Sequence, residues 1–300
     1  MKILLLGKNG QVGWELQRSL ATLGEITALD SSTPGPWRAD FSQPEGLAPM
    51  IRTIAPDIIV NAAAHTAVDQ AESEPDRARA INASAPGVIA REAAALGAWL
   101  LHYSTDYVFD GSGNQPRDEQ AATGPLSVYG RSKLEGEDLI RASGCRHLIL
   151  RTSWVYAARG GNFAKTMLKL AAERDVLKVI DDQIGAPTGA DMLADVSAHA
   201  LRCVIATPGL GGTYHCVANG DTSWHGYARL VIEWARSHGQ AIKVAADAIH
   251  AIPTSAYPTL ATRPLNSRLA TGKLRAAFGV HLPPWQAGVE RMLGEVLGAP

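Results

Sequence analysis

The first half of the chain alternates short apolar runs with helix-like segments, and this alternation restricts the fold more than any other feature. Apolar runs occupy residues 2–6, 26–30, 57–64, 98–105 and 147–156, and helical periodicity follows at 14–24, where Gly24 is expected to end the helix, at 76–97 and at 125–143. Strands written as continuous apolar runs are buried on both faces, as in a parallel sheet covered by helices. The sequence therefore predicts an α/β fold with a doubly wound parallel sheet.

After about residue 152 this rhythm changes. Helices are expected at 162–173, 191–206 and 223–239, and shorter strands at 177–180 and 212–217, with Pro- and Gly-rich connections between them. We expect residues 1–152 to form a dinucleotide-binding domain and residues 153–300 to form a smaller C-terminal α/β substrate lobe. The two are expected to interleave, with parts of 175–215 completing the sheet.

The charge and apolar content of the chain narrow its partners and its compartment. The formal net charge is -1 and no basic block occurs, which argues against nucleic acid as a partner. No stretch approaches the roughly 20 apolar residues of a membrane span, and the apolar run at the N-terminus is too short for a signal peptide. Cys145, Cys203 and Cys216 lack metal-ligand spacing, so reduced thiols and a cytoplasmic location are expected.

A glycine motif separates the first expected strand from the first expected helix. Gly7, Gly10 and Gly13 form G-x-x-G-x-x-G in this turn. Glycine is needed where the backbone turns tightly and where a phosphate approaches the amides. The free N–H groups and the positive dipole end of the helix then favour a pyrophosphate. The motif predicts a Rossmann-type dinucleotide site, and the alternative is a simple strand–helix turn.

Asp30 stands at the end of the second expected strand, where an acid can bind the adenosine ribose hydroxyls. Such an acid favours NADH, because it repels a 2′-phosphate. Ser31 and Ser32 follow it rather than an arginine, while Lys8 in the glycine loop could offset part of the repulsion. We expect both NADH and NADPH to be used. The alternative for Asp30 is a turn residue.

A tyrosine and a lysine four residues apart open the helix expected at 125–143. Tyr129 and Lys133 share one helix face at this spacing, and Thr105 and Asp106 end the strand at 98–105. A hydroxyl at a strand end followed by Tyr-x-x-x-Lys one loop later is the arrangement of short-chain dehydrogenases/reductases. The pair alone is a weak signal, and the glycine motif and Asp30 strengthen it.

The residue types suit hydride transfer to a carbonyl carbon, which leaves an alkoxide to be protonated. The Tyr129 hydroxyl can supply the proton, although the pKa of a free phenol is about 10. A neighbouring cation such as Lys133 is expected to pull that pKa towards neutrality. Thr105 can donate a hydrogen bond to the developing oxyanion. The catalytic candidates are therefore Tyr129, Lys133 and Thr105.

At this level of detail the chain resembles the dTDP-4-dehydrorhamnose reductases of the extended short-chain class. The matching strings run from residue 7 to about 269 and are GKNGQVGWELQ, VNAAAHTAVDQAESEP, HYSTDYVFDG, VYGRSKLEGE, RTSWVY, NFAKTML, DDQIGAPTGADMLAD, PTSAYPT and RPLNSRL. The resemblance implies reduction of the C4 ketone of dTDP-4-dehydro-6-deoxy-L-mannose by NADPH or NADH. The product would be dTDP-L-rhamnose, a precursor for polysaccharide biosynthesis.

The resemblance also implies roles for individual residues. Together with the glycine motif it assigns cofactor binding to Gly7, Gly10, Gln11, Val12, Gly13, Asp30, Asp40, Phe41, Ala64, His65, Thr66, Thr105, Asp106, Tyr129 and Lys133. Substrate contacts are assigned to Trp154, Asn162, Phe163, Arg263 and Asn266. Some family members form a homodimer bridged by Mg²⁺, for which Glu15 and Asp191 are the candidate ligands. Asp191 stands where the family has a glutamate, and a solvated helix face is the alternative for both.

Three other functions are compatible with the same fold. A sugar-nucleotide dehydratase shares the Tyr/Lys pair but carries Thr-Asp-Glu, whereas Tyr107 follows Thr105 and Asp106 here. A sugar-nucleotide epimerase is a further alternative. A non-catalytic subunit like the regulatory β subunit of methionine adenosyltransferase is the alternative outside enzymology, and the intact Thr105, Tyr129 and Lys133 weigh against it.

Overall fold

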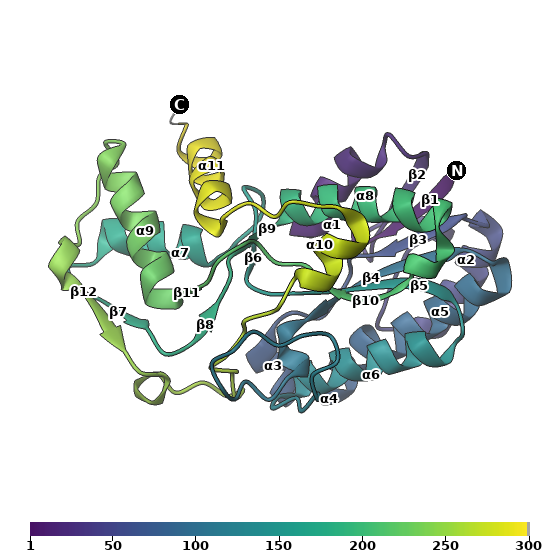
Figure 1. The fold of residues 1–300 in the computed structure, drawn as a ribbon, viewed down its shortest axis with the longest axis horizontal. Coiled ribbons are helices and arrows are strands. Elements are labelled where there is room, and N and C mark those ends of the chain that lie inside the picture. The colour runs from purple at the N-terminus through teal and green to yellow at the C-terminus, as the bar shows by residue number, and fades with distance from the viewer. Residues whose placement is uncertain (299–300) are drawn as a thin grey trace.

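A central sheet of six parallel strands organises the protein, for which a computed structural model describes residues 1–298 (Figure 1). The strands are β1 (Lys2–Leu6), β2 (Glu25–Leu29), β3 (Ile58–Asn61), β4 (Trp99–Thr105), β5 (Arg146–Thr152) and β10 (Gly212–His215), in the order β10-β5-β4-β3-β1-β2. The order reverses between β1 and β3, and open α/β sheets bind ligands at such a point. The predicted Rossmann-type doubly wound sheet is confirmed.

Side-chain alternation along β1 explains why the sheet is covered on both faces. Ile3 and Leu5 join one buried apolar cluster, while Leu4 and Leu6 join a second cluster on the opposite face. Successive side chains of a strand point to opposite faces, so a strand that is apolar throughout needs a cover on each. The continuous apolar run of β1 therefore requires two helical layers.

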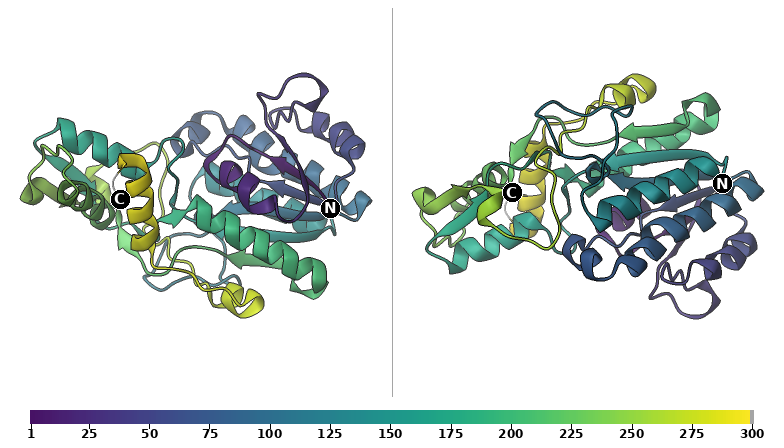
Figure 2. Two further views of the ribbon diagram at one scale, coloured as in Figure 1. Left: turned by 90° about the horizontal axis from the view of Figure 1, so that it is seen from above. Right: turned by 90° about the horizontal axis from the view of Figure 1, so that it is seen from below.

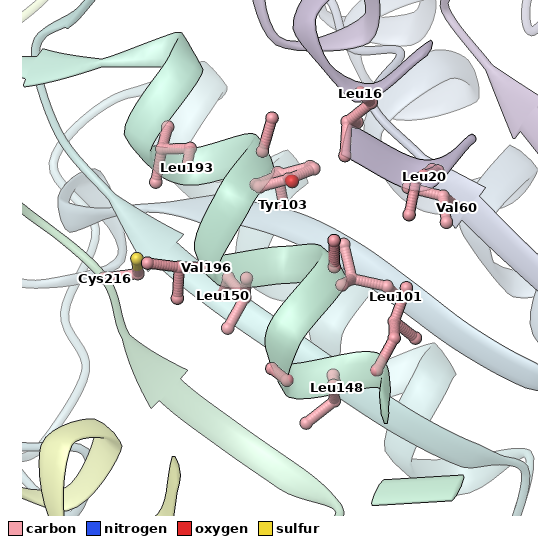
Figure 3. Packing of buried hydrophobic residues seen from close by; sticks show 14 of the residues in the cluster. Leu16, Leu20, Val60, Leu101, Tyr103, Leu148, Leu150, Leu193, Val196 and Cys216 are labelled. Atoms are coloured by element: carbon pink, nitrogen blue, oxygen red, sulfur yellow. The ribbon is translucent and has the colours of Figure 1, made fainter. Parts of the chain in front are cut away.

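Helices supply both layers. One face is covered by α1 (Gln11–Leu20), α8 (Ala190–Ala206) and α10 (Gly272–Phe278), and the other by α2 (Leu47–Ile54), α5 (Ala85–Leu96) and α6 (Val128–Ala142). Figure 2 shows α1 and α8 over the sheet from above and α5 and α6 over it from below. Figure 3 shows Leu193 and Val196 of α8 packing towards Leu148 and Leu150 of β5.

A second group of helices lies at the other end of the molecule (Figure 1). It comprises α7 (Phe163–Glu173), α9 (Trp224–Ser237) and α11 (Trp285–Leu297), which share an apolar cluster that includes Tyr227. Paired short strands accompany them: β7 (Leu177–Ile180) with β12 (Ile249–Ile252), β8 (Ile184–Gly185) with β11 (Thr222–Ser223), and β6 (Val155–Tyr156) with β9 (Thr188–Gly189). The division at residue 152 stays a prediction, while α8 and β10 pack with the central sheet.

Short helices connect the larger elements. They are η1 (Gly35–Trp37), η2 (Pro44–Gly46), α3 (Val68–Ser73), α4 (Pro75–Arg79), the π-helical turn η3 (Ala80–Ser84), η4 (Asp106–Val108), η5 (Pro208–Leu210), η6 (Ala246–Ala248) and η7 (Thr254–Ala256). The helix expected at 76–97 is thus divided by a π-helical turn. Among residues 1–298, no helix is both long enough and apolar enough to cross a membrane.

The expected role of Gly24 was wrong. Helix α1 ends at Leu20, and its C-cap residue is Ala21. A Cβ atom at Gly24 would lie 2.1 Å from the Met1 carbonyl oxygen, and the Glu25 amide donates to that oxygen at 2.9 Å. Gly24 therefore permits the close approach of the β1 and β2 starts.

Candidate active site

The glycine loop forms a backbone cradle between β1 and α1. Gly7 has φ +90°, and a Cβ atom there would lie 2.7 Å from the Ala63 amide nitrogen. A Cβ atom at Gly13 would lie 2.0 Å from the Gly7 carbonyl oxygen. Gly10 is the N-cap of α1 and has no side chain to cap it, so the first amides of α1 stay available. This geometry fits the phosphates of a dinucleotide.

Two neighbouring cavities meet at this loop, and Gly10, Ala62 and Ala64 line both. The larger, of about 970 Å³, is lined by Asn9, Gly10, Gln11, Val12, Ala62, Ala64, Thr66, Val68, Tyr103, Ser104, Thr105, Asp106, Tyr107, Tyr129, Lys133, Thr152, Ser153, Trp154, Val155, Arg159, Gly160 and Trp224. The smaller, of about 490 Å³, is lined by Gly7, Gly10, Asp30, Ser31, Arg38, Ala39, Asp40, Phe41, Ser42, Ala62, Ala63, Ala64, Arg77 and Ile81. Together they provide a continuous path past the N-terminus of α1.

Asp30 lies at the smaller cavity with a fixed side chain. Its carboxylate accepts hydrogen bonds from Ser32, Thr33 and Asn9. Partial burial raises the pKa of Asp30, but the hydrogen bonds from Ser32, Asn9 and Thr33 outweigh burial and hold that pKa below its usual value. The carboxylate therefore stays ionised and can accept further hydrogen bonds from a ligand.

Arg38 and Asp40 lie on the same cavity as Asp30. The Arg38 guanidinium donates to the Asp40 carboxylate at 3.0 Å, and Arg77 also lines the cavity. Sequence reasoning missed both arginines, because neither directly follows Asp30. Arg38 could have been found from its position two residues before the assigned Asp40.

The catalytic candidates converge on the larger cavity from two elements. Thr105 is the last residue of β4, and Tyr129 and Lys133 lie in the first two turns of α6. Ser127 caps α6 by accepting a hydrogen bond from the Gly130 amide at 3.1 Å, which fixes where the helix starts. The strand end and the capped helix together bring the three side chains to one cavity.

The protonation of Tyr129 differs from the expected one. Burial raises the pKa of the Tyr129 phenol, and the Thr105 hydroxyl opposes this shift. Lys133 is buried too: its Nζ donates to the Tyr103 carbonyl oxygen at 2.6 Å and lies 3.1 Å from His102 Nε2. Burial lowers the pKa of Lys133 to about 8, and the Glu137 carboxylate opposes this shift. The expectation of a lowered pKa for Tyr129 was therefore wrong, because desolvation raises that pKa by more than the Thr105 hydrogen bond lowers it.

Asp106 is a second buried acid on the same cavity. The Thr105 hydroxyl donates to its carboxylate at 3.0 Å. Burial raises the pKa of Asp106 to about 6, and hydrogen bonds from Ser267 and Thr105 limit the shift. Asp106 thus orients the Thr105 hydroxyl.

An aromatic stack forms the far wall of the larger cavity. The rings of Trp154 and Trp224 are stacked with centroids 3.6 Å apart and planes 14° apart. Trp154 has φ +49°, a backbone conformation that residues other than glycine rarely adopt. Residues with such backbone strain cluster at functional sites. Trp224 donates through Nε1 to Gln183 at 3.1 Å. The sequence predicted a substrate contact for Trp154 but none for Trp224, which lies 70 residues later in the chain.

Several assigned residues lie outside both cavities. His65 is buried, and its amide donates to Asn82. Asn162 caps α7, and Phe163 packs on Trp224 with centroids 4.6 Å apart. Arg263 forms an ion pair with Asp69 at 2.6 Å, and Asn266 is buried with its amide donating to the Ser112 and Gln115 carbonyls. Their assigned roles stay predictions.

The two candidate metal ligands lie on different helices and form ion pairs. Glu15 on α1 lies 3.7 Å from Arg18, and Asp191 at the start of α8 lies 3.0 Å from Arg291. Within residues 1–298, no group of three His, Cys, Asp or Glu side chains is placed to hold a metal ion.

Known proteins resemble the chain along almost its whole length. The family described as RmlD substrate binding domain matches residues 1–297. A dTDP-4-dehydrorhamnose reductase of Escherichia coli (strain K12) is 57% identical over 296 residues, which cover 99% of this chain and 98% of that protein. The chain belongs to the dTDP-4-dehydrorhamnose reductase family.

Solved structures of this reductase family have the same fold. The reductase from Clostridium acetobutylicum ATCC 824 has a TM-score of 0.89 and 34% identity, covering 99% of this chain and 100% of that one. The reductase from Bacillus anthracis str. Ames, solved in complex with NADP, has a TM-score of 0.87 and 34% identity, covering 98% and 99%. The dehydratase, epimerase and regulatory-subunit alternatives are not favoured by these relatives.

Proposed function

We propose that the chain reduces the C4 ketone of dTDP-4-dehydro-6-deoxy-L-mannose to give dTDP-L-rhamnose. The observation that carries this proposal is the convergence of Thr105, Tyr129 and Lys133 on a cavity that continues past the α1 N-terminus to Asp30. Family membership supports the same reaction. The two cavities, of about 970 and 490 Å³, share lining residues and offer space for a dinucleotide beside a second ligand.

A nicotinamide dinucleotide, when bound, supplies the hydride. The amides at the start of α1 would hold its pyrophosphate, and Asp30 would hold its adenosine ribose. Tyr129 donates its Oη proton to the oxygen that was the ketone oxygen, since a raised pKa keeps the phenol protonated at neutral pH. Thr105 can donate its one hydroxyl proton to that oxygen by turning it away from Asp106. Lys133 in its ammonium form stabilises the phenolate left behind.

The cofactor choice rests on opposed charges around the smaller cavity. Asp30 favours NADH, while Arg38 and Arg77 on the same cavity can attract the 2′-phosphate of NADPH. Arg38 is 61% exposed and bound to Asp40, so it can turn towards an added phosphate at little cost. We propose that both NADPH and NADH are used.

The stacked Trp154 and Trp224 rings provide an apolar surface for the sugar nucleotide, because sugar and base faces pack on aromatic rings. Arg263 is proposed as the cation for the diphosphate, which would require its side chain to turn from Asp69 towards the cavity. Cytoplasmic action, a homodimer, and Mg²⁺ held between two copies by Glu15 and Asp191 are further proposals, and the reaction above requires none of them.

The proposal is tested by following the oxidation of NADPH and of NADH with enzymatically prepared dTDP-4-dehydro-6-deoxy-L-mannose. Wild-type protein should turn over with both cofactors, and Tyr129→Phe should lower kcat by about 10²–10⁴-fold while cofactor binding is retained. The second-lobe variant Tyr156→Phe is the matched control for loss of a buried phenol. Absence of turnover by the wild type with either cofactor would reject the proposed substrate.

A further inference from the structure

A buried chain of hydrogen bonds connects the turn after β3 to the catalytic lysine. The Ala63 amide donates to Asn61 Oδ1 at 3.0 Å, and Asn61 Nδ2 lies 3.0 Å from His102 Nδ1. His102 Nε2 lies 3.1 Å from Lys133 Nζ, which also donates to the Tyr103 carbonyl at 2.6 Å. Asn61 and His102 are each 1% exposed and line neither cavity, so neither can turn to water for a partner. Lys133 is 2% exposed and lines the larger cavity.

The direction of each hydrogen bond in this series is fixed by the Ala63 amide at one end. The Ala63 N–H group can only donate, so the Asn61 atom facing it is the carbonyl oxygen. The amide nitrogen of Asn61 therefore faces His102, and because that nitrogen also only donates, His102 Nδ1 accepts. Burial lowers the pKa of His102 well below its usual value, and the nearby Lys133 adds to the shift. The neutral ring then carries its one proton on Nε2.

An Nε2–H group pointing at Lys133 needs an acceptor, and only the neutral amine has a lone pair. That amine still donates to the Tyr103 carbonyl. An ammonium at Lys133 can only donate, so it would need an unprotonated His102 Nε2 as acceptor. The imidazole proton would then lie on Nδ1, where it faces the Asn61 amide nitrogen, which is also a donor. Turning the Asn61 amide would then set its nitrogen against the Ala63 N–H. Each arrangement with an ammonium thus leaves two buried donors facing each other, which is costly.

We propose that Asn61 and His102 are positioning residues that make the Lys133 ammonium easier to deprotonate and tie its protonation to the turn after β3. Ala63 lies in that turn, and its neighbours Ala62 and Ala64 line both cavities. A ligand that moves this turn is therefore expected to change how readily Lys133 loses its proton. The importance of that charge for turnover rests on the proposed function, whereas the tautomer of His102 does not.

Other charged and titratable groups around Lys133 do not reverse this preference. They are Tyr129 and Glu137 on α6, His102 on β4, Asp106 after β4, and Arg151 on β5. Glu137 favours the ammonium, but Arg151 binds its two carboxylate oxygens at 2.8 and 2.7 Å and offsets its charge. Tyr129 is a neutral phenol, and Asp106 directs one oxygen to Thr105.

The first test is the tautomer of His102 in the full-length wild-type protein, without substrate. Two-bond ¹H–¹⁵N correlation spectra of protein labelled with ¹⁵N-histidine distinguish a protonated ring nitrogen from a bare one, and His102 is assigned by correlation to its backbone. Above pH 8, where Lys133 has lost its proton, we expect a bare Nδ1 and a protonated Nε2. A protonated Nδ1 with a bare Nε2 under those conditions, or a ring protonated on both nitrogens, would overturn the proposal.

The second test is Asn61→Asp, whose carboxylate accepts from both the Ala63 amide and a His102 Nδ1–H. The His102 tautomer should reverse, and the alkaline limb of kcat/KM should move to higher pH by about one unit, as an added negative charge and a bare Nε2 both favour the ammonium. The exposed Asn114→Asp is the control for the added charge alone. An unchanged tautomer in a folded Asn61→Asp protein would contradict the proposed coupling. A reversed tautomer without any turnover by the wild type would instead reject the proposed function.

Discussion

Glu137 on α6 and Arg151 on β5 form a fully buried bidentate ion pair beneath the larger cavity. The Arg151 Nε and Nη2 atoms donate to the two Glu137 oxygens at 2.8 and 2.7 Å, and Arg141 adds a third bond at 3.0 Å. Burial raises the pKa of Glu137, but the Arg151 guanidinium outweighs burial and holds that pKa below its usual value. The pair fastens the helix that carries Tyr129 and Lys133 to the sheet.

Removing one member of this pair should destabilise the fold strongly. We expect Arg151→Met to lower the free energy of unfolding by about 3–5 kcal/mol, because a buried carboxylate loses its main partner. The double variant with Glu137→Met should recover part of the loss, since no charge is left unpaired. Arg79→Met is the control, because its pair with Glu135 at 2.7 Å is exposed and contributes little to stability. Equal losses at the two sites, in urea unfolding, would contradict this account.

The glycine loop predicts a sharp contrast between two neighbouring glycines. Gly7→Ala should lower the free energy of unfolding by about 1–3 kcal/mol, because φ is +90° and the new Cβ would meet the Ala63 backbone. Gly10→Ala should cost much less, since its φ is -69° and the nearest atom to a Cβ is the Gly7 oxygen at 3.4 Å. Urea unfolding of both variants measures the difference. Similar losses would mean that the strain lies elsewhere.

The stacked tryptophans predict a selective effect on the keto-sugar. Trp224→Ala removes the ring that stacks on Trp154 at 3.6 Å, and it should raise KM for the sugar nucleotide by about tenfold, in keeping with the 0.5–1.5 kcal/mol of an aromatic pair. The Kd for NADPH, measured by fluorescence titration, should stay near the wild-type value. Trp37→Ala, on η1 far along the chain from both rings, is the control. Parallel changes in both constants would show a general disturbance of the fold.

A buried histidine predicts how stability depends on pH. Burial lowers the pKa of His215 to about 3, and the Arg151 charge adds to the shift, while an unfolded histidine titrates near 6.5. Below pH 6.5, His215 therefore binds a proton in the unfolded chain, whereas it stays neutral in the folded chain. This favours unfolding by about 1.4 kcal/mol for each pH unit between 6.5 and the folded pKa. His215→Gln should make the fall in unfolding free energy between pH 6 and 5 shallower by about that slope. Parallel profiles for variant and wild type would contradict the assignment.

Local patterns in the sequence determined the sheet strands and the positions of several active-site residues along the chain. Continuous apolar runs and the helix period of 3.6 residues are short-range signals, so the strands β1, β3, β4 and β5 and the helix carrying Tyr129 and Lys133 could be predicted. The glycine motif between β1 and α1 could be read in the same way, because the turn needs glycine wherever the rest of the chain lies. The strand-end position of Thr105 followed from the order of elements.

Only the tertiary structure decided which groups face one another and how far they are buried. Lys133 on α6 meets His102 on β4, and Trp154 meets Trp224 from 70 residues away in the chain. Arg38 reaches the cavity of Asp30 through an irregular loop. The direction of the Tyr129 pKa also depended on burial, which no local spacing encodes. Desolvation and hydrogen-bond polarity arise from long-range packing, and they set the chemistry of residues whose positions the sequence had already indicated.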